Sequence, residues 1–318
     1  IGSSGSAFFI TTVNAFMNAP TGFTLVNGEL TEIQPLTAMF NVATPTKVSH
    51  VLASAYLTSA FVLAMIAAFA ILRGKKHAYY RKALKLTMVA AFVFALATFV
   101  VGDLSGKYLA QVQPEKLAAA EWHFTTTEKA PLVLGGVLTE ENEVKFALEI
   151  PYALSILAHG MPGAEVIGLD QFAEELIPPL STHYFFDVMV LIGIYLLVVP
   201  GLYLMLSRYS PARLSHPLLL GAIVAGGPLS MIAIEAGWIF TELGRQPWIL
   251  VGVMRTSEGA TTASYVDVML VLFAGLYVVL SVLCVTALWR MFRHHSPEQE
   301  LVVRGLARED EDRWVMNG

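Results

Sequence analysis

Long apolar segments alternate with polar ones along this chain of 318 residues. A transmembrane helix needs about 20 apolar residues. Five stretches meet that length, at roughly 48–72, 83–101, 184–207, 217–242 and 266–289. The pattern therefore predicts an all-α integral membrane protein, built as a transmembrane helix bundle.

The first apolar stretch, 7–17, is too short to span a bilayer on its own. No initiator methionine, charged leader or cleavage site precedes it. We expect this segment to be the end of a transmembrane helix from a longer protein.

Basic residues gather in three of the connecting segments: "RGKKHAYYRKALK", "SRYSPAR" and the residues after the last span. The positive-inside rule places these segments in the cytoplasm and the other loops outside. The chain then divides, in order, into a truncated helix end (1–18), an outer loop (19–47), two helices with a cytoplasmic loop (48–101), a long outer loop (102–182), two more helices (183–242), an outer loop (243–264), the last helix (265–290) and a cytoplasmic tail (291–318).

Composition narrows the chemistry that this membrane protein can perform. Hydrophobic residues make up 55% of the chain and charged residues 14%, which agrees with a membrane protein. The single cysteine, Cys284, excludes a disulfide framework, a C-x-x-C-H haem attachment and a Cys-ligated iron–sulfur or zinc site. Any metal must be bound by His, Met or carboxylate side chains. The net charge of −5, without a basic stripe, speaks against a nucleic-acid partner.

The outer loop 102–182 contains twelve acidic residues against four lysines. Its composition predicts a solvated acidic lobe, and its two histidines, His123 and His159, are expected to be solvated as well. Loops this long usually bind something. A loop that only adds solubility is the alternative.

Two side chains at matched depth form a candidate ligand pair. His50, in "KVSHVLASAYLTSAF", lies about one turn inside the outer end of its span, and Met189, in "HYFFDVMVLIG", lies at a similar depth in another. An interhelical hydrogen bond for the histidine and simple packing for the methionine are the ordinary roles. Imidazole and thioether on two helices are also the axial ligands that a six-coordinate haem requires.

Carboxylates on the 217–242 span raise a second question. Glu235 and Glu242 are seven residues apart, about two helical turns, so they share one face. A carboxylate at membrane depth costs several kcal/mol unless it is paired. Glu242 has three possible roles: pairing with Arg245, binding a high-spin iron, or relaying protons. Asp187 and Asp267 lie near outer span ends and are expected to be hydrated.

Six blocks of sequence, in order, resemble subunit I of the cytochrome bd quinol oxidases, and the resemblance runs nearly end to end. The blocks are "VNAFMNAPTGF" (13–23), "KVSHVLASAY" (47–56), "GDLSGKYLAQVQPEKLAAAEW" (102–122), "VKFALEIPYALSILA" (144–158), "VIGLDQF" (166–172) and "IEAGWIFTELGRQPW" (234–248). The last block is the most specific. By this resemblance, roughly the first four transmembrane helices of the family's subunit I are missing here.

The resemblance implies roles for individual residues. His50 and Met189 match the axial ligands of the low-spin haem b. Lys116 and Glu121 match a pair in the extracytoplasmic quinol-binding loop that is implicated in quinol oxidation. Asp103 lies at the start of that loop.

The family signature near residue 242 implies a second haem site. Glu242 matches the carboxylate associated with the high-spin haem b, and Arg245 and Trp238 belong to the same region. A ferric haem would then offset the cost of burying Glu242. Asp187 is a departure, because some relatives have an arginine there beside the haem propionates.

The function implied is that of a terminal respiratory oxidase, a quinol:O2 oxidoreductase in a bacterial cytoplasmic (inner) membrane. Its cofactors would be low-spin haem b, high-spin haem b, and haem d or a further haem b. Its partners would be quinol, O2, membrane lipid, subunit II and a small accessory subunit. Electrons would pass from quinol at the outer face through the haems to O2, which is reduced to water.

Two alternatives stay open at this point. One is a cyanide-insensitive relative that contains only b-type haems. The other belongs to a different class: a membrane transporter whose intramembrane acids Glu235, Glu242 and Asp267 line a polar path.

Overall fold

The computed structural model describes residues 1–139, 143–294, 300–301 and 303–304. Much of the predicted tail 291–318 therefore lies outside the described residues. The helices are α1 (Gly2–Asn18), α2 (Pro35–Met39), α3 (Thr44–Leu72), α4 (Ala78–Val112), α5 (Pro114–Ala120), α6 (Ala153–His159), α7 (Thr182–Tyr209), α8 (Pro217–Leu243) and α9 (Val266–His294), with short 3-10 turns η1 (Leu169–Gln171), η2 (Glu174–Leu176) and η3 (Pro211–Ser215).

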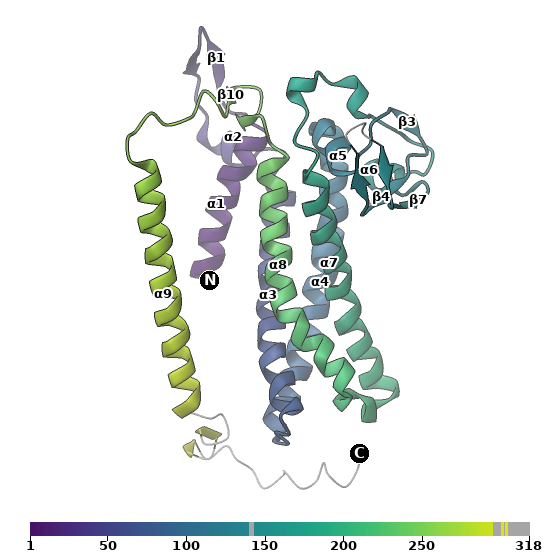
Figure 1. The fold of residues 1–318 in the computed structure, drawn as a ribbon, viewed down its shortest axis with the longest axis vertical. Helices are drawn as coiled ribbons and strands as arrows, with labels where there is room; N and C mark the ends of the chain where they lie inside the picture. Colours follow the sequence, from purple (N-terminus) through teal and green to yellow (C-terminus); the bar gives the residue numbers. More distant parts are fainter. Residues whose placement is uncertain (140–142, 295–299, 302, 305–318) are drawn as a thin grey trace.

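Five of these helices, α3, α4, α7, α8 and α9, are long and apolar enough to cross a membrane. The prediction of an all-α transmembrane bundle is thus confirmed within the described part of the chain. At the lower end in Figure 1, two histidines begin helices by accepting a backbone hydrogen bond. His77 Nδ1 accepts from Tyr79 at the start of α4, and His216 Nδ1 accepts from Leu218 at the start of α8.

Helices α3, α4, α7 and α8 form a four-helix bundle. Helix α3 packs against α4 and α8, and α7 packs against the same two helices, so α3 and α7 lie diagonally across the bundle. Glycine allows the closest approach: a Cβ at Gly226 of α8 would lie 2.4 Å from the Phe61 ring of α3. The buried apolar residues of the four helices form one packed cluster, whose members run in sequence order from Leu57 on α3 to Ile223 on α8.

The loops that contain the strands lie at one end of the bundle, the upper end in Figure 1. Their strands pair only two by two and antiparallel: β1 (Thr24–Val26) with β2 (Glu29–Thr31), β3 (Thr127–Glu128) with β8 (Glu165–Val166), β4 (Leu132–Leu134) with β7 (Leu148–Ile150), β5 (Val137–Leu138) with β6 (Val144–Lys145), and β9 (Trp248–Leu250) with β10 (Met254–Arg255). Helices α5 and α6 pack here against the upper parts of α4 and α7. The segment 102–182 therefore begins as the end of α4 and continues as a compact loop region.

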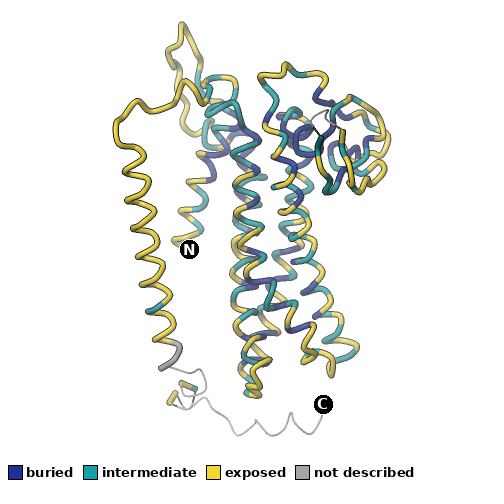
Figure 2. The backbone as a smooth tube through the Cα atoms, in the orientation of Figure 1, coloured by how far each residue is buried: buried dark blue, intermediate teal, exposed yellow. Residues whose placement is uncertain are grey.

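Helix α9 differs from the other long helices. None of its spanning window is buried, whereas a third of the α3 and α8 windows is buried. Figure 2 shows α9 exposed along its length and standing apart from the bundle. The bundle and the loop region above it therefore contain the candidate sites.

Candidate active site: two ligand positions below a buried acidic loop

His50 and Met189 lie on the diagonal helices of the bundle, α3 and α7. The other two helices place glycines beside them. A Cβ at Gly102 of α4 would lie 3.7 Å from His50 Cε1, and a Cβ at Gly237 of α8 would lie 3.1 Å from Met189 Sδ. The four helices thus bring an imidazole, a thioether and two positions without side chains to the part of the bundle nearest the loop region.

This arrangement fits an axial pair for a haem. His50 Nδ1 is buried and has no hydrogen-bond partner among the described residues, so the imidazole is not held by an interhelical bond through that nitrogen. A buried polar atom without a partner is costly. The glycines at 102 and 237 let the His50 and Met189 side chains lie close to the backbone of the neighbouring helices. The ligand assignment itself stays a prediction.

Glu242, near the end of α8, is held by two neighbours. Asn14 Nδ2 of α1 donates to Glu242 Oε1 at 2.9 Å, and Arg245 pairs with the other carboxylate oxygen. The Lys47 ammonium of α3 donates to Asn14 Oδ1 at 3.3 Å. The pairing with Arg245 that the sequence allowed is therefore present, and the role of Glu242 at a high-spin haem stays a prediction.

Lys116 joins this cluster from α5. The side chain was expected in an exposed loop, and that expectation was wrong, because only 1% of it is exposed. Its ammonium donates to Thr241 O at 3.2 Å and lies 4.9 Å from the centre of the Phe240 ring. Burial lowers the pKa of Lys116 well below its usual value, and the positive charges of Lys47 and Arg245 lower it further.

Glu121, at the end of α5, is buried to the same degree, again contrary to the expected exposed position. Neither of its carboxylate oxygens has a hydrogen-bond partner in the described part of the chain. Burial raises the pKa of Glu121 well above its usual value, and the nearby charge of Asp187 raises it further. A buried, unpartnered carboxyl group with a raised pKa is typical of functional sites.

Asp187 is also buried, so the expected hydrated position was wrong. Its Oδ2 accepts a hydrogen bond from the backbone N–H of Gly135, in the turn between β4 and β5, and lies 3.3 Å from His183 Nε2. The loop folds over the start of α7 and covers this carboxylate. The sequence could not show this contact because the partner lies in a distant turn.

The remaining predicted site residues are exposed or only partly buried. Asp103 is 44% exposed and forms an ion pair of 2.5 Å with Lys107, one turn further along α4. Trp238 is partly buried on α8, and Glu235 is exposed on the same helix. Asp267, at the start of α9, is exposed as expected.

The two loop histidines differ from each other. His159 is exposed, as expected. His123 is not solvated as expected: it is buried, its Nε2 lies 3.1 Å from Val166 O, and burial lowers its pKa. It fastens the end of α5 to β8 rather than contributing to the cluster around Glu121.

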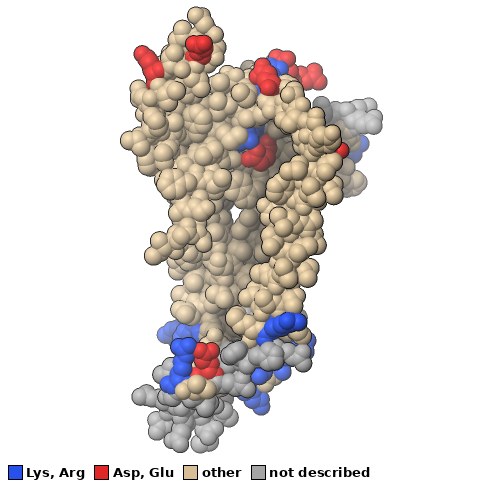
Figure 3. Space-filling view, turned by 90° about the vertical axis from the view of Figure 1, so that its left-hand side faces the viewer, with Lys and Arg blue, Asp and Glu red and all other residues tan. Residues whose placement is uncertain are grey.

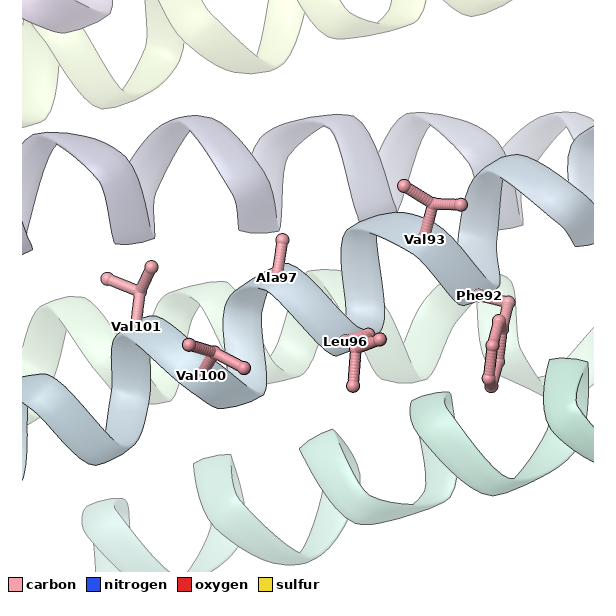
Figure 4. A pocket seen from close by; sticks show the side chains of 6 residues that line it. All are labelled: Phe92, Val93, Leu96, Ala97, Val100 and Val101. Atoms are coloured by element: carbon pink, nitrogen blue, oxygen red, sulfur yellow. The ribbon is translucent and has the colours of Figure 1, made fainter.

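Other parts of the described chain offer no competing site. A groove along α4 is shown in Figure 4 and is lined by apolar side chains alone: Phe92, Val93, Leu96, Ala97, Val100 and Val101. No group of three or more His, Cys, Asp or Glu side chains in the described residues could hold a metal ion. In Figure 3, the middle of the visible face has few charged side chains. One acidic and one basic group lie next to each other in its upper half.

Comparisons with known proteins identify the family of this chain. The model of the cytochrome bd terminal oxidase subunit I family matches residues 1–296. A putative cytochrome bd menaquinol oxidase subunit I from Bacillus subtilis is 38% identical over 307 residues, which cover 95% of this chain and 69% of that protein. A cytochrome bd ubiquinol oxidase subunit 1 from the same organism is 30% identical, covering 89% of this chain and 64% of its own length.

A solved structure shares both sequence and fold with this chain. The bd oxidase from Geobacillus thermodenitrificans is 61% identical, with a TM-score of 0.88, over 93% of this chain and 68% of that chain. The family model, the curated relatives and the solved structure lead to one result. This chain belongs to the cytochrome bd terminal oxidase subunit I family, a family of haem-containing quinol oxidases in bacterial membranes.

Proposed function

We propose that this chain binds quinol beside Glu121 and Lys116, holds a low-spin haem b between His50 and Met189, and holds a high-spin haem b near Glu242. The observation that carries the proposal is the position of Glu121. Its unpartnered carboxyl group is buried close to Asp187 of α7. The same helix carries Met189 two residues after Asp187. The group that would take a proton, at the end of α5, thus lies against the first turns of α7, the helix that carries the proposed haem ligand.

Glu121 acts as the base for the proton that a quinol hydroxyl loses on oxidation. A general base is most effective when its pKa lies near the working pH, and burial moves the pKa of Glu121 in that direction. Lys116 lies in the same short helix, where its ammonium has one backbone acceptor and an aromatic face as neighbours. It is suited to orient a quinol oxygen.

The donor set around Glu242 fits a haem. Three basic side chains, Lys47, Lys116 and Arg245, lie near the carboxylate of Glu242, and Glu115 is a second acidic neighbour of Lys116. Buried positive charge in excess calls for an anionic partner, and haem propionates have that chemistry. When bound, the haems would accept the electrons of quinol and deliver them to O2. The oxygen site would contain haem d or a further haem b, and pigment extraction distinguishes these two cofactors.

The distribution of charge supports an orientation with the quinol loop outside. In Figure 3 most visible Lys and Arg lie at the lower end and most visible Asp and Glu in the upper half. The positive-inside rule then places the lower end in the cytoplasm. Protons released near Glu121 leave on the outer side. Subunit II and a small accessory subunit complete the proposed assembly, and the membrane is the bacterial cytoplasmic membrane.

The test is Glu121→Gln and Lys116→Gln in the assembled oxidase. We expect quinol turnover to fall by about 100-fold or more for Glu121→Gln, the range for loss of a general base. Reduction of the haems by dithionite should stay intact. Glu128→Gln, at an exposed carboxylate of the same loop region, is the control.

The pH dependence gives a second readout of the same variant. The base form of Glu121 is the ionised form, so quinol oxidation should slow as the pH falls below its raised pKa. Because that pKa is raised, the decline should begin at a higher pH than for an ordinary carboxylate, and Glu121→Gln should abolish it. Unchanged quinol turnover in Glu121→Gln would refute the proposed role.

A further inference from the structure

His183, the second residue of α7, connects three parts of the structure. Its side chain is 0% exposed. Nδ1 lies 2.7 Å from the carbonyl oxygen of Ala120, at the end of α5, and Nε2 lies 3.1 Å from the carbonyl oxygen of Gly135. Nε2 also lies 3.3 Å from Asp187 Oδ2. One imidazole therefore joins the end of α5, the turn between β4 and β5, and the first turns of α7.

The hydrogen-bond partners indicate which protons the ring carries. Carbonyl oxygens only accept hydrogen bonds, so a proton on each ring nitrogen satisfies both contacts. Asp187 is the third polar neighbour of the ring, next to Nε2.

Trp122 adds a second hold on the same segment. Its ring stacks on the His183 ring with centroids 3.8 Å apart and planes at 23°. The indole N–H donates to Leu180 O at 2.9 Å, just before α7. Trp122 also has a left-handed backbone conformation, with φ of 46°, which a non-glycine residue adopts only when its surroundings hold it.

These contacts hold the residues on both sides of Glu121. Ala120 precedes it and is bonded through its carbonyl, and Trp122 follows it and is stacked. No side chain among the described residues holds the Glu121 carboxylate by a hydrogen bond, and the backbone N–H of Val133 is the neighbour that favours its ionised form. Its orientation therefore depends on the backbone, and His183 is the side chain that fastens that backbone to α7.

We propose that His183 is a positioning residue for quinol oxidation: it sets the direction of the Glu121 carboxylate and ties it to the helix that carries Met189. The inference rests on the proposed function, in which Glu121 takes the proton of quinol. His183 does not contact the quinol. It acts through the peptide on each side of Glu121 and through the turn at Gly135.

The test compares two substitutions in the assembled oxidase, His183→Phe and His183→Gln. Phenylalanine keeps a ring to stack on Trp122 but removes both hydrogen bonds. Glutamine keeps one donor group, which can reach one of the two carbonyls. The control is His159→Phe, at an exposed histidine of the same loop region.

For His183→Phe we expect kcat with quinol to fall by roughly 10-fold or more, because a misplacement of about 1 Å can cost about 100-fold. The change in KM should be smaller, and the low-spin haem spectrum after dithionite reduction should be unchanged. His183→Gln should lie between this variant and the parent. A merely structural role would instead lower the yield of folded, haem-loaded protein and leave the kcat of the surviving fraction unchanged.

Parallel assays of Glu121→Gln separate the two proposals. If Glu121→Gln keeps its quinol turnover, the proposed function is wrong. If Glu121→Gln is inactive but folded His183→Phe has the parent kcat, only the positioning role is wrong. Should His183→Phe fail to fold, His183→Gln decides: a parent kcat overturns the inference and a reduced kcat supports it.

Discussion

The first two turns of α7 contain two sites that differ in how complete they are. At the first, the loop site, His183 and Asp187 are buried against the loop region, and both have hydrogen-bond partners from its backbone. At the second, the bundle site, Met189 faces the backbone at Gly237. His50, on the diagonal helix α3, has a buried nitrogen without a partner among the described residues. The loop site is thus partly satisfied by the protein itself, through the contacts of His183 and of Asp187 Oδ2, whereas His50 Nδ1 in the bundle site has no partner among the described residues.

Under the proposed function, this difference corresponds to the place where a cofactor would bind. Buried polar groups in folded proteins are nearly always hydrogen-bonded, so each exception calls for an explanation. The bundle site has an explanation in a haem between imidazole and thioether. Glu121 and Asp187 Oδ1 are the exceptions within the loop site, and under the proposed function the unpartnered Glu121 carboxylate would meet the hydroxyl group of the substrate.

The largest effect should come from removing a bundle ligand. We expect His50→Ala or Met189→Leu to abolish the low-spin haem b signal in a reduced-minus-oxidised spectrum, because six-coordination needs both axial groups. The loop site does not depend on either side chain. Met88→Leu, at a fully buried methionine in the core of the bundle, is the matched control and should keep the spectrum. A normal low-spin signal in both His50→Ala and Met189→Leu would contradict the assignment.

The bundle site was largely predictable from sequence. Apolar runs of spanning length gave the long helices, and counting residues from their outer ends brought His50 and Met189 to matched depth. Depth depends only on local helix geometry, which the sequence determines directly. The glycines beside the two ligands were not predicted, because which helix faces meet is a tertiary property.

The loop site was predicted only in part. Lys116 and Glu121 were selected by resemblance, but both were expected to be exposed, and both are buried. An acidic composition predicts solvation on average and cannot identify the one carboxylate that α7 covers. His183, Asn14 and Lys47 were missed altogether, although each lies in or next to a conspicuous segment. Their contacts join residues far apart along the chain, and no local pattern announces such pairs.

A smaller and more selective effect is expected at Glu242, whose carboxylate has hydrogen-bond partners, as in the loop site, and is proposed to lie beside a haem, as in the bundle site. Its carboxylate has two partners, Asn14 and Arg245, yet an excess of positive charge surrounds it. Glu242→Gln should remove or shift the high-spin haem b signal while the low-spin signal stays. If Glu242 served only its pairing with Arg245, stability would fall and the spectrum would be unaltered.

The control for Glu242 is another ion pair with no place in the proposed site. Glu175 pairs with Arg255 at 3.4 Å, and its side chain is mostly exposed. Glu175→Gln should leave both haem signals unchanged. An identical spectral change in the two variants would show that the loss of any outer ion pair disturbs the haem region, and the special role of Glu242 would be lost.

The smallest effect is expected at Asp103, where the resemblance and the geometry point to different roles. Its position at the start of the quinol loop implies a part in quinol oxidation, but its carboxylate pairs with Lys107 on an exposed face of α4. Exposed ion pairs one helical turn apart contribute less than about 1 kcal/mol, because water screens them and long side chains lose entropy when they are fixed. We therefore expect Asp103→Asn to change thermal stability little and to reduce quinol turnover far less than Glu121→Gln, with Lys107→Gln giving the same small change. Turnover and melting temperature of the three variants, measured side by side, test this order. A loss of turnover in Asp103→Asn as large as that in Glu121→Gln, with Lys107→Gln active, would extend the quinol site from the buried loop to the surface of α4.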